Sequence, residues 1–244
     1  MRTTPVDARN IDPSSASLVW LGYDPPQLDA PQDAATSLSD ADVMSAHDAE
    51  VGAPAYNSFM GGLAATNDHE DPHLVAIGHS YGSRPVGAAV QESGGIPGAD
   101  DIILVGSPRT GVDHAEDLGV GKDHVFVGAA ANDPVTHLPS KKEAVAGTVG
   151  YLGGGPIGAY VLGDLADQGD DDLWFGKDPA GEAFGARRFK VSDGPVPLLD
   201  GQGLTTPAHS NYFNPARDKD PVSAANIAAV VADRPDLVTW DKYR

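Results

Sequence analysis

The apolar residues of this chain gather in short runs that are separated by polar stretches rich in Asp, Gly and Pro. Four of the runs have the length and composition of buried strands, and they lie at residues 18–22, 74–77, 101–106 and 124–129. A fifth run, at residues 187–191, contains two arginines, which indicates an exposed or edge strand. Residues 1–17 are polar and predict an irregular segment, so residues 18–22 form the first predicted strand.

Segments of helical composition alternate with these strands. Residues 37–65 begin with capping residues and contain Pro54, which predicts two helices or one kinked helix. Residues 83–91 and 222–232 are also predicted as helices. Short buried strands that alternate with helices are typical of the α/β class, so we expect a mostly parallel sheet with helices on both faces.

Length and composition favour one domain that spans residues 1–244. With 41% hydrophobic residues, the chain can bury one sizeable core, and no stretch of it resembles an interdomain linker. Residues 141–184 depart from the alternating pattern, because they are first Gly-rich and uncharged and then acidic. We expect this segment to form a cap or a pocket wall.

Functional residues of a parallel sheet are expected at the carboxyl ends of its strands. Gly22, Ser80, Ser107 and Asp133 all fall just after predicted strands. These four positions are therefore expected to lie near one another.

The main chemical motif is Gly78-His79-Ser80-Tyr81-Gly82, which comes directly after a predicted strand. The Gly-x-Ser-x-Gly pattern is typical of a nucleophile elbow, where a serine at strained φ and ψ angles stands on a sharp turn from strand to helix. We expect both glycines to be needed for the two backbones to pass closely. The pattern also arises by chance in a chain with 29 glycines, so an inert serine in an ordinary turn is the alternative. The flanking strand and helix favour Ser80 as a nucleophile.

A nucleophilic serine needs a base within hydrogen-bond reach and a carboxylate that orients the base. Asp133 follows a predicted strand and is the candidate acid, and Asn132 is expected to help fix its loop. The alternative is an Asp that only caps a helix or makes a turn before Pro134.

The candidate base is His209, in the loop that follows the last predicted strand. Serine, then acid, then histidine is the chain order of one class of triad on parallel sheets. His137 follows Asp133 closely and is the second choice for the base. The side chain of His79 is expected to point away from Ser80.

Two backbone N–H groups are expected to stabilise an oxyanion formed at Ser80. One is that of Tyr81, the residue after the nucleophile, and the second usually comes from a loop after an earlier strand. Here the loop after residues 18–22 offers the N–H groups of Tyr23 and Asp24, although it has no Gly-rich turn.

The net charge of −19 argues against nucleic acid, anionic lipid and long acidic substrates as partners. The Ser80 motif instead predicts a small-molecule acyl substrate. The chain has no cysteine, which excludes disulfides and thiol catalysis and leaves the compartment undecided. No signal-like N-terminus is present, which favours the cytoplasm slightly, and residues 144–163 are too rich in glycine for a membrane span.

Metal sites and cofactors are not expected. Residues 69–73 and 164–172 are rich in acidic residues, but neither has a recognised ligand spacing, so solvated loops are the simpler interpretation. The Ser80 motif itself implies no cofactor.

Five pieces of the chain resemble, in order, an alpha/beta-hydrolase family found mainly in actinobacteria and catalogued as domain of unknown function 1023. The pieces are Trp20-Leu21-Gly22-Tyr23-Asp24-Pro25-Pro26, Gly78-His79-Ser80-Tyr81-Gly82-Ser83, Ala131-Asn132-Asp133-Pro134-Val135, Phe184-Gly185-Ala186-Arg187-Arg188-Phe189 and His209-Ser210-Asn211-Tyr212-Phe213. The resemblance implies an alpha/beta-hydrolase fold and a triad of Ser80, Asp133 and His209. Members of that family usually carry one more strand, with a Gly-rich turn, before the first piece. The resemblance therefore implies either a sheet that is reduced at its N-terminal side or a strand at residues 18–22 that has moved beside the strand before Ser80.

These patterns predict a serine hydrolase that cleaves an ester, thioester or amide through an acyl-enzyme on Ser80. One alternative is a weak or inactive interaction module that keeps the fold and lacks the second oxyanion donor. Another is an acyltransferase with the same triad, because transfer and hydrolysis share the acyl-enzyme.

Overall fold

The computed structural model of the chain describes residues 4–23, 46–69, 71–137, 172–173, 176–200 and 203–243. Its centre is a four-stranded sheet in the order β1-β2-β3-β6, and all three neighbouring pairs are parallel. The strands are β1 (Val75–His79), β2 (Asp101–Val105), β3 (Val125–Gly128) and β6 (Arg187–Arg188). The sheet confirms the predicted strands at residues 74–77, 101–106, 124–129 and 187–191, with β6 at one edge of the described sheet.

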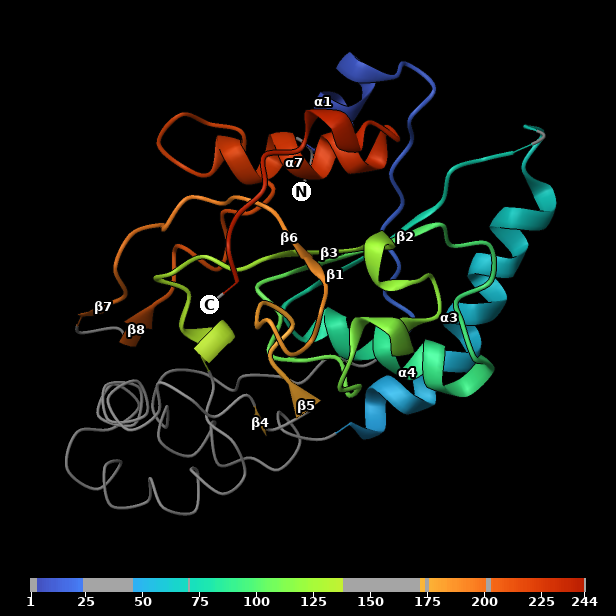
Figure 1. The fold of residues 1–244 in the computed structure, drawn as a ribbon, viewed down its shortest axis with the longest axis horizontal. Helices are drawn as coiled ribbons and strands as arrows, with labels where there is room; N and C mark the ends of the chain where they lie inside the picture. The colour runs from blue at the N-terminus through green and yellow to red at the C-terminus, as the bar shows by residue number, and fades with distance from the viewer. Residues whose placement is uncertain are drawn as a thin grey trace.

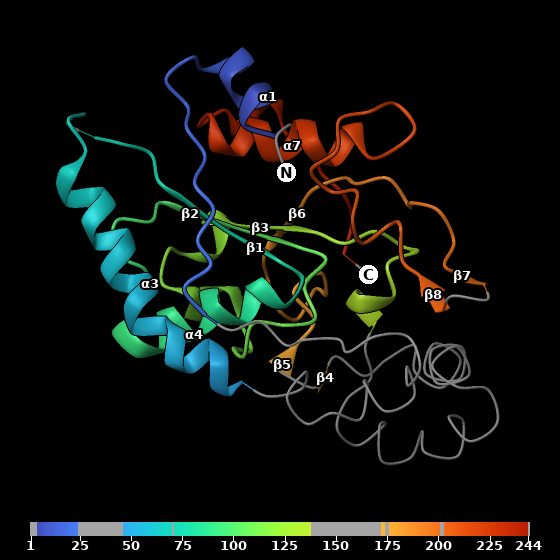
Figure 2. The same ribbon diagram turned by 180° about the vertical axis from the view of Figure 1, so that it is seen from behind.

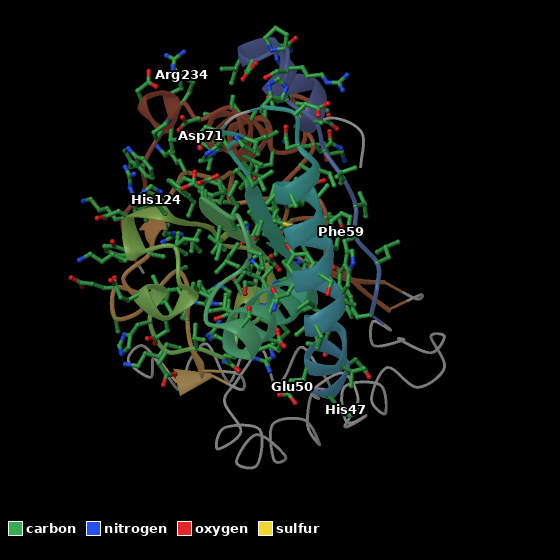
Figure 3. The ribbon with its side chains drawn as sticks, turned by 90° about the vertical axis from the view of Figure 1, so that its right-hand side faces the viewer. His47, Glu50, Phe59, Asp71, His124 and Arg234 are labelled. Atoms are coloured by element: carbon green, nitrogen blue, oxygen red, sulfur yellow. The ribbon has the colours of Figure 1, made fainter. Side chains whose placement is uncertain are left out.

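Helices cover both faces of the sheet, as predicted (Figure 1). Two of them lie on one face, α3 (His47–Thr66) and α4 (Ser83–Ser93), and pack against each other. On the other face, α7 (Pro221–Val231) packs against α1 (Thr4–Ile11), which Figure 2 shows from behind. In Figure 3, α3 is seen along its side, with His47 and Glu50 near its first turn.

The core consists of two apolar clusters, one on each face of the sheet. Side chains of a strand alternate between faces, so Ile102 and Leu104 of β2 belong to the cluster under α3 and α4. Ile103 and Val105 belong to the cluster under α7. All four side chains are fully buried, which explains why this strand is an unbroken apolar run in the sequence.

The other described elements are short. Two hairpins are formed by β4 (Asp172–Leu173) with β5 (Gly176–Lys177) and by β7 (Leu198–Asp200) with β8 (Gly203–Thr205). The 3-10 turns are η1 (Ser80–Gly82), η2 (Ala115–Leu118), η3 (Lys122–His124), η4 (Pro134–His137) and η5 (Pro235–Leu237).

The predicted first strand is wrong. Residues 18–22 form no strand in the structure, and Leu18, Val19 and Leu21 are 63%, 63% and 76% exposed. An apolar run indicates burial only when another layer covers it, and in this segment Trp20 is the residue that packs against a core cluster. Gly22 therefore does not mark the carboxyl end of a strand.

The N-terminal helix α1 and the continuity of α3 were also not predicted. Residues 4–11 are helical because Ala8 is fully buried and Ile11 packs against the cluster under α7, although the segment is mostly polar. Helix α3 runs through Pro54 without a break. The expected start of this helix, at residues 37–45, lies outside the described residues. So do residues 141–171, which are most of the expected cap.

Candidate active site

Ser80 stands directly after β1, where the chain turns through η1 into α4. Its φ angle is +55°, in the left-handed region that residues other than glycine rarely adopt. A strained serine between a strand and a helix is the backbone geometry that the Gly-x-Ser-x-Gly motif predicts.

The two motif glycines differ in what they allow. A Cβ atom on Gly78 would lie 2.8 Å from Ser83 Cα and 3.1 Å from the carbonyl oxygen of Gly82, so the strand and the helix touch there. A Cβ atom on Gly82 would meet no described atom within 4 Å, and the φ of −57° at Gly82 is ordinary helical backbone. The expectation that both glycines are sterically required is therefore wrong for Gly82.

Asp133 lies in the turn between β3 and η4 and is fully buried. The N–H of Val135 donates to Asp133 Oδ1 over 3.0 Å. The side chain of Asn132 donates to the carbonyl oxygen of Gly194 over 2.7 Å, and its backbone N–H donates to that of Asp193. These bonds confirm the expectation that Asn132 helps to fix this loop.

The carboxylate of Asp133 contacts the imidazole of His209. His209 Nδ1 lies 2.9 Å from Asp133 Oδ2 and 3.0 Å from Oδ1, and the Tyr212 hydroxyl donates to Oδ2 over 2.7 Å. Burial by itself raises the pKa of Asp133. The net effect is a lowered pKa, because His209 contributes hydrogen bonds and a charge, and the Tyr212 hydroxyl and the Val135 N–H donate further hydrogen bonds. The acid thus stays ionised and holds His209 with Nδ1 protonated, which leaves Nε2 to accept a proton.

The same geometry separates the two candidate bases. It is His209 that contacts Asp133, whereas His137, the second choice, lies at the end of η4. Tyr212 was not singled out from the sequence as a site residue, because only the folded loop brings its hydroxyl to Asp133.

The side chain of His79 contacts the candidate base. Its ring stacks on that of His209 with centroids 4.8 Å apart, and its Nε2 lies 2.9 Å from the carbonyl oxygen of His209. Alternation along β1 explains this position, since Val75 packs against the cluster that contains Ala208 and Tyr212 and residue 79 lies on the same face.

Gly106, which follows β2, lies between the elbow and the Asp133–His209 pair. The register of the sheet places His79 opposite Val105, so Ser80 and Gly106 are the first residues after two adjacent strands. A Cβ atom on Gly106 would lie 3.0 Å from both Asp133 Oδ2 and His209 Nδ1. The elbow therefore leaves the sheet beside the pair. The sequence marked Gly106 only as the last residue of a predicted strand.

The two expected oxyanion donors belong to stacked tyrosines. The rings of Tyr23 and Tyr81 have centroids 6.1 Å apart, and Trp20 stacks on the other side of Tyr23 at 5.9 Å. Burial raises the pKa of both tyrosines, that of Tyr81 to about 12, so both hydroxyls are neutral at physiological pH. The segment of Tyr23 thus reaches the elbow although it does not form a strand.

Metal ligation and membrane insertion can be checked only over the described part of the chain. There, no group of three or more His, Cys, Asp or Glu side chains is placed to hold a metal ion. Within the same ranges, no helix combines the length and the apolar character that a membrane span requires.

Comparison with known proteins identifies a family. The family described as alpha/beta hydrolase matches residues 5–143 of this chain. An uncharacterised protein of Mycobacterium tuberculosis is 41% identical over 122 residues, which are 50% of this chain and 41% of that protein. A second one from the same organism is 30% identical over 210 residues, 85% of this chain and 28% of that protein. The chain thus spans less than half the length of either relative, and no solved structure matches it.

Proposed function

Because the chain belongs to the alpha/beta-hydrolase family, we propose that it is a serine hydrolase whose catalytic residues are Ser80, Asp133 and His209. The observation that carries the proposal is the hydrogen bond of 2.9 Å between the buried Asp133 carboxylate and His209 Nδ1, beside a serine with a φ of +55°. The five motif pieces also lead us to propose membership of the narrower actinobacterial family, domain of unknown function 1023.

The proposed reaction is an acyl transfer in two steps. Ser80 Oγ attacks the carbonyl carbon of an ester, thioester or amide while its proton passes to His209 Nε2. The same proton then goes to the leaving group as the tetrahedral intermediate collapses to an acyl-serine. In the second step, His209 takes a proton from water, the hydroxide attacks the acyl-serine, and Ser80 regains its proton as the acid product leaves.

Asp133 stabilises the cationic form of His209 that exists in both steps, and it keeps the ring oriented through Nδ1. For the oxyanion we propose the backbone N–H groups of Tyr81 and Tyr23 as donors. Support for Tyr81 is its position after the nucleophile, at the start of a helix, and support for Tyr23 is the stacking of its ring on that of Tyr81. Carboxylic esters are the first substrates to test, by analogy with the fold.

A second candidate function is a weakly active or inactive interaction module. The observation that favours it is the absence of a strand at residues 18–22, which leaves β1 at the edge of the described sheet and Tyr23 outside a strand end. Loss of one oxyanion donor typically lowers kcat by about 10²- to 10³-fold. Acyl transfer to an acceptor other than water would use the same residues.

Labelling with a fluorophosphonate probe tests the proposal, since the probe reacts with an activated serine without needing the natural substrate. We expect the wild-type protein to be labelled at Ser80 and the Ser80→Ala and His209→Ala variants to stay unlabelled. Ser58→Ala, on the exposed side of α3, is the matched control and should be labelled like the wild type. A folded wild-type protein that the probe does not label would overturn the hydrolase proposal, and labelling without turnover of p-nitrophenyl esters would favour the interaction module.

A further inference from the structure

His79 connects the elbow to the loop of the proposed base. It is the last residue of β1, where it pairs with Val105 of the neighbouring strand and immediately precedes Ser80. Its side chain contacts His209 twice, once through the stacked rings and once through the carbonyl oxygen of His209. A single residue of the sheet thus touches both the ring and the main chain of His209.

The hydrogen bond defines the protonation of His79. A carbonyl oxygen can only accept, so the contact of 2.9 Å requires a proton on His79 Nε2. A neutral imidazole then has its lone pair on Nδ1. Because the acceptor belongs to the backbone of residue 209, this bond holds the position of the loop as well as that of a side chain.

The surroundings of His79 favour the neutral ring. Burial lowers the pKa of His79, and the positive charge that His209 takes up lowers it further, against an opposing effect of the bond to the His209 carbonyl and of Asp133. The rings of Tyr212 and Phe213 make T-shaped contacts with the same ring, at centroid distances of 6.0 and 5.6 Å. A neutral ring in this place lets His209 become cationic without a second positive charge against its face.

We propose that His79 is a positioning residue of the hydrolase, which holds the loop and the ring of His209 beside Ser80 through its Nε2–H donor and its stacked ring. This inference rests on the proposed function of Ser80, Asp133 and His209. A base displaced by about 1 Å can cost about 10²-fold in rate, so the two contacts matter even though His79 exchanges no proton with the substrate.

Three variants separate the donor from the ring. His79→Phe keeps an aromatic ring and loses the donor, whereas His79→Gln loses the ring and places an amide N–H near the position of Nε2. We expect His79→Phe to lower kcat and the rate of probe labelling by about 10- to 100-fold with little change in KM, and His79→Gln to recover part of the loss. His79→Asn lacks the ring and its amide is too short to reach, so it should lose at least as much activity as His79→Phe.

The control is His124→Phe. It makes the same chemical change just before β3, at the opposite end of the sheet, where His124 Nδ1 lies 2.8 Å from Asp101 Oδ1. His124 is labelled in Figure 3. Circular dichroism of each variant shows whether it is folded. If His79→Phe does not fold, the comparison of His79→Gln with His79→Asn decides, and nitrogen NMR of the wild-type protein gives an answer without any variant. At about pH 8, above the ordinary histidine pKa of about 6.5, His79 should be the neutral Nε2–H tautomer.

The outcomes distinguish the two proposals. If the Ser80 and His209 variants abolish labelling while folded His79→Phe and His79→Asn keep the wild-type kcat, the role of His79 is refuted and the hydrolase stands. An Nδ1–H tautomer or a cationic His79 in the NMR spectrum also refutes it. If Ser80→Ala is labelled like the wild type, the hydrolase proposal itself fails.

Discussion

The hydroxyl group of Tyr212 donates a hydrogen bond of 2.7 Å to Asp133 Oδ2, the same oxygen that contacts His209 Nδ1. The hydroxyl oxygen also accepts a bond of 2.9 Å from the N–H of Ala130. Tyr212 is fully buried, so these contacts are shielded from water. Asp133 is therefore fixed between the proposed base on one side and Tyr212 on the other, and Tyr212 is itself bonded to the loop that carries Asp133.

Tyr212→Phe removes one donor to Asp133 and leaves the N–H of Ala130 without its acceptor. We expect the free energy of unfolding to fall by about 1–3 kcal/mol, since a buried polar group then lacks a partner. The hydroxyl also helps to keep the pKa of Asp133 in the folded protein below the ordinary carboxyl value of 3.8. A lowered pKa stabilises the folded protein at pH values above 3.8, and this stabilisation is lost as the pH falls through the folded pKa. In Tyr212→Phe, the free energy of unfolding should therefore begin to fall at a higher pH than in the wild type as the solution is acidified.

Urea unfolding of the variant at several pH values between about 2 and 7 measures both effects. Tyr243→Phe is the matched control, because Tyr243 is 44% exposed and its loss should leave stability and pH dependence unchanged. Equal acid stability of Tyr212→Phe and the wild type would show that the hydroxyl does not act on Asp133.

Gly106→Ala should disrupt the pair of Asp133 and His209. The added methyl group would lie within 3.0 Å of both side chains and 2.8 Å from a ring carbon of Tyr212, and the φ of +56° adds backbone strain. We expect the rate of probe labelling to fall by about 10²-fold, because the base is displaced from its productive position. Gly94→Ala carries a similar strain at a φ of +74° with no described atom within 4 Å of its Cβ, so it should keep the labelling rate. Similar losses in the two variants would assign the effect to strain alone.

The two motif glycines should respond in opposite ways to alanine. Gly78→Ala places a methyl group against the backbone of residues 82 and 83, so we expect a loss of about 1–3 kcal/mol in the free energy of unfolding and a displaced elbow. Gly82→Ala has open space and helical φ and ψ, so it should be neutral or stabilise the protein by up to about 1 kcal/mol. Thermal unfolding and probe labelling of the pair provide the comparison, and equal destabilisation by both would contradict it.

Local patterns predicted most of the fold because most of its elements have a local signal. Strands β1, β2 and β3 are short apolar runs between turns, and helix α7 is rich in alanine. Helix α1 escaped detection because its stability depends on α7, far away in the sequence. The strand predicted at residues 18–22 was wrong for a related reason, because an apolar pattern does not show whether another layer of the fold covers the segment.

The residues of the candidate site likewise fall into those with a local sequence signal and those without one. Ser80 carries a motif, and Asp133 and His209 follow from chain order and from their places after strands. His79, Gly106 and Tyr212 have no such signal, because their roles come from a strand face, a register and the path of a loop that only the folded chain defines.

At the amino end of the sheet, His73 should make stability depend on pH near neutrality. Its Nε2 lies 3.1 Å from Asp101 Oδ2, and this hydrogen bond raises the pKa of His73 above 6.5. Burial opposes the rise, and the negative charges of Asp101 and Asp233 add to it. A raised folded pKa contributes stability that is complete below the unfolded value of about 6.5 and is lost as the pH rises through the folded value. The free energy of unfolding should therefore decline above pH 6.5 in the wild type, and this decline should shrink in His73→Gln. His69→Gln, an exposed histidine nearby in sequence, is the control, and an unchanged slope in His73→Gln would exclude His73 as its source.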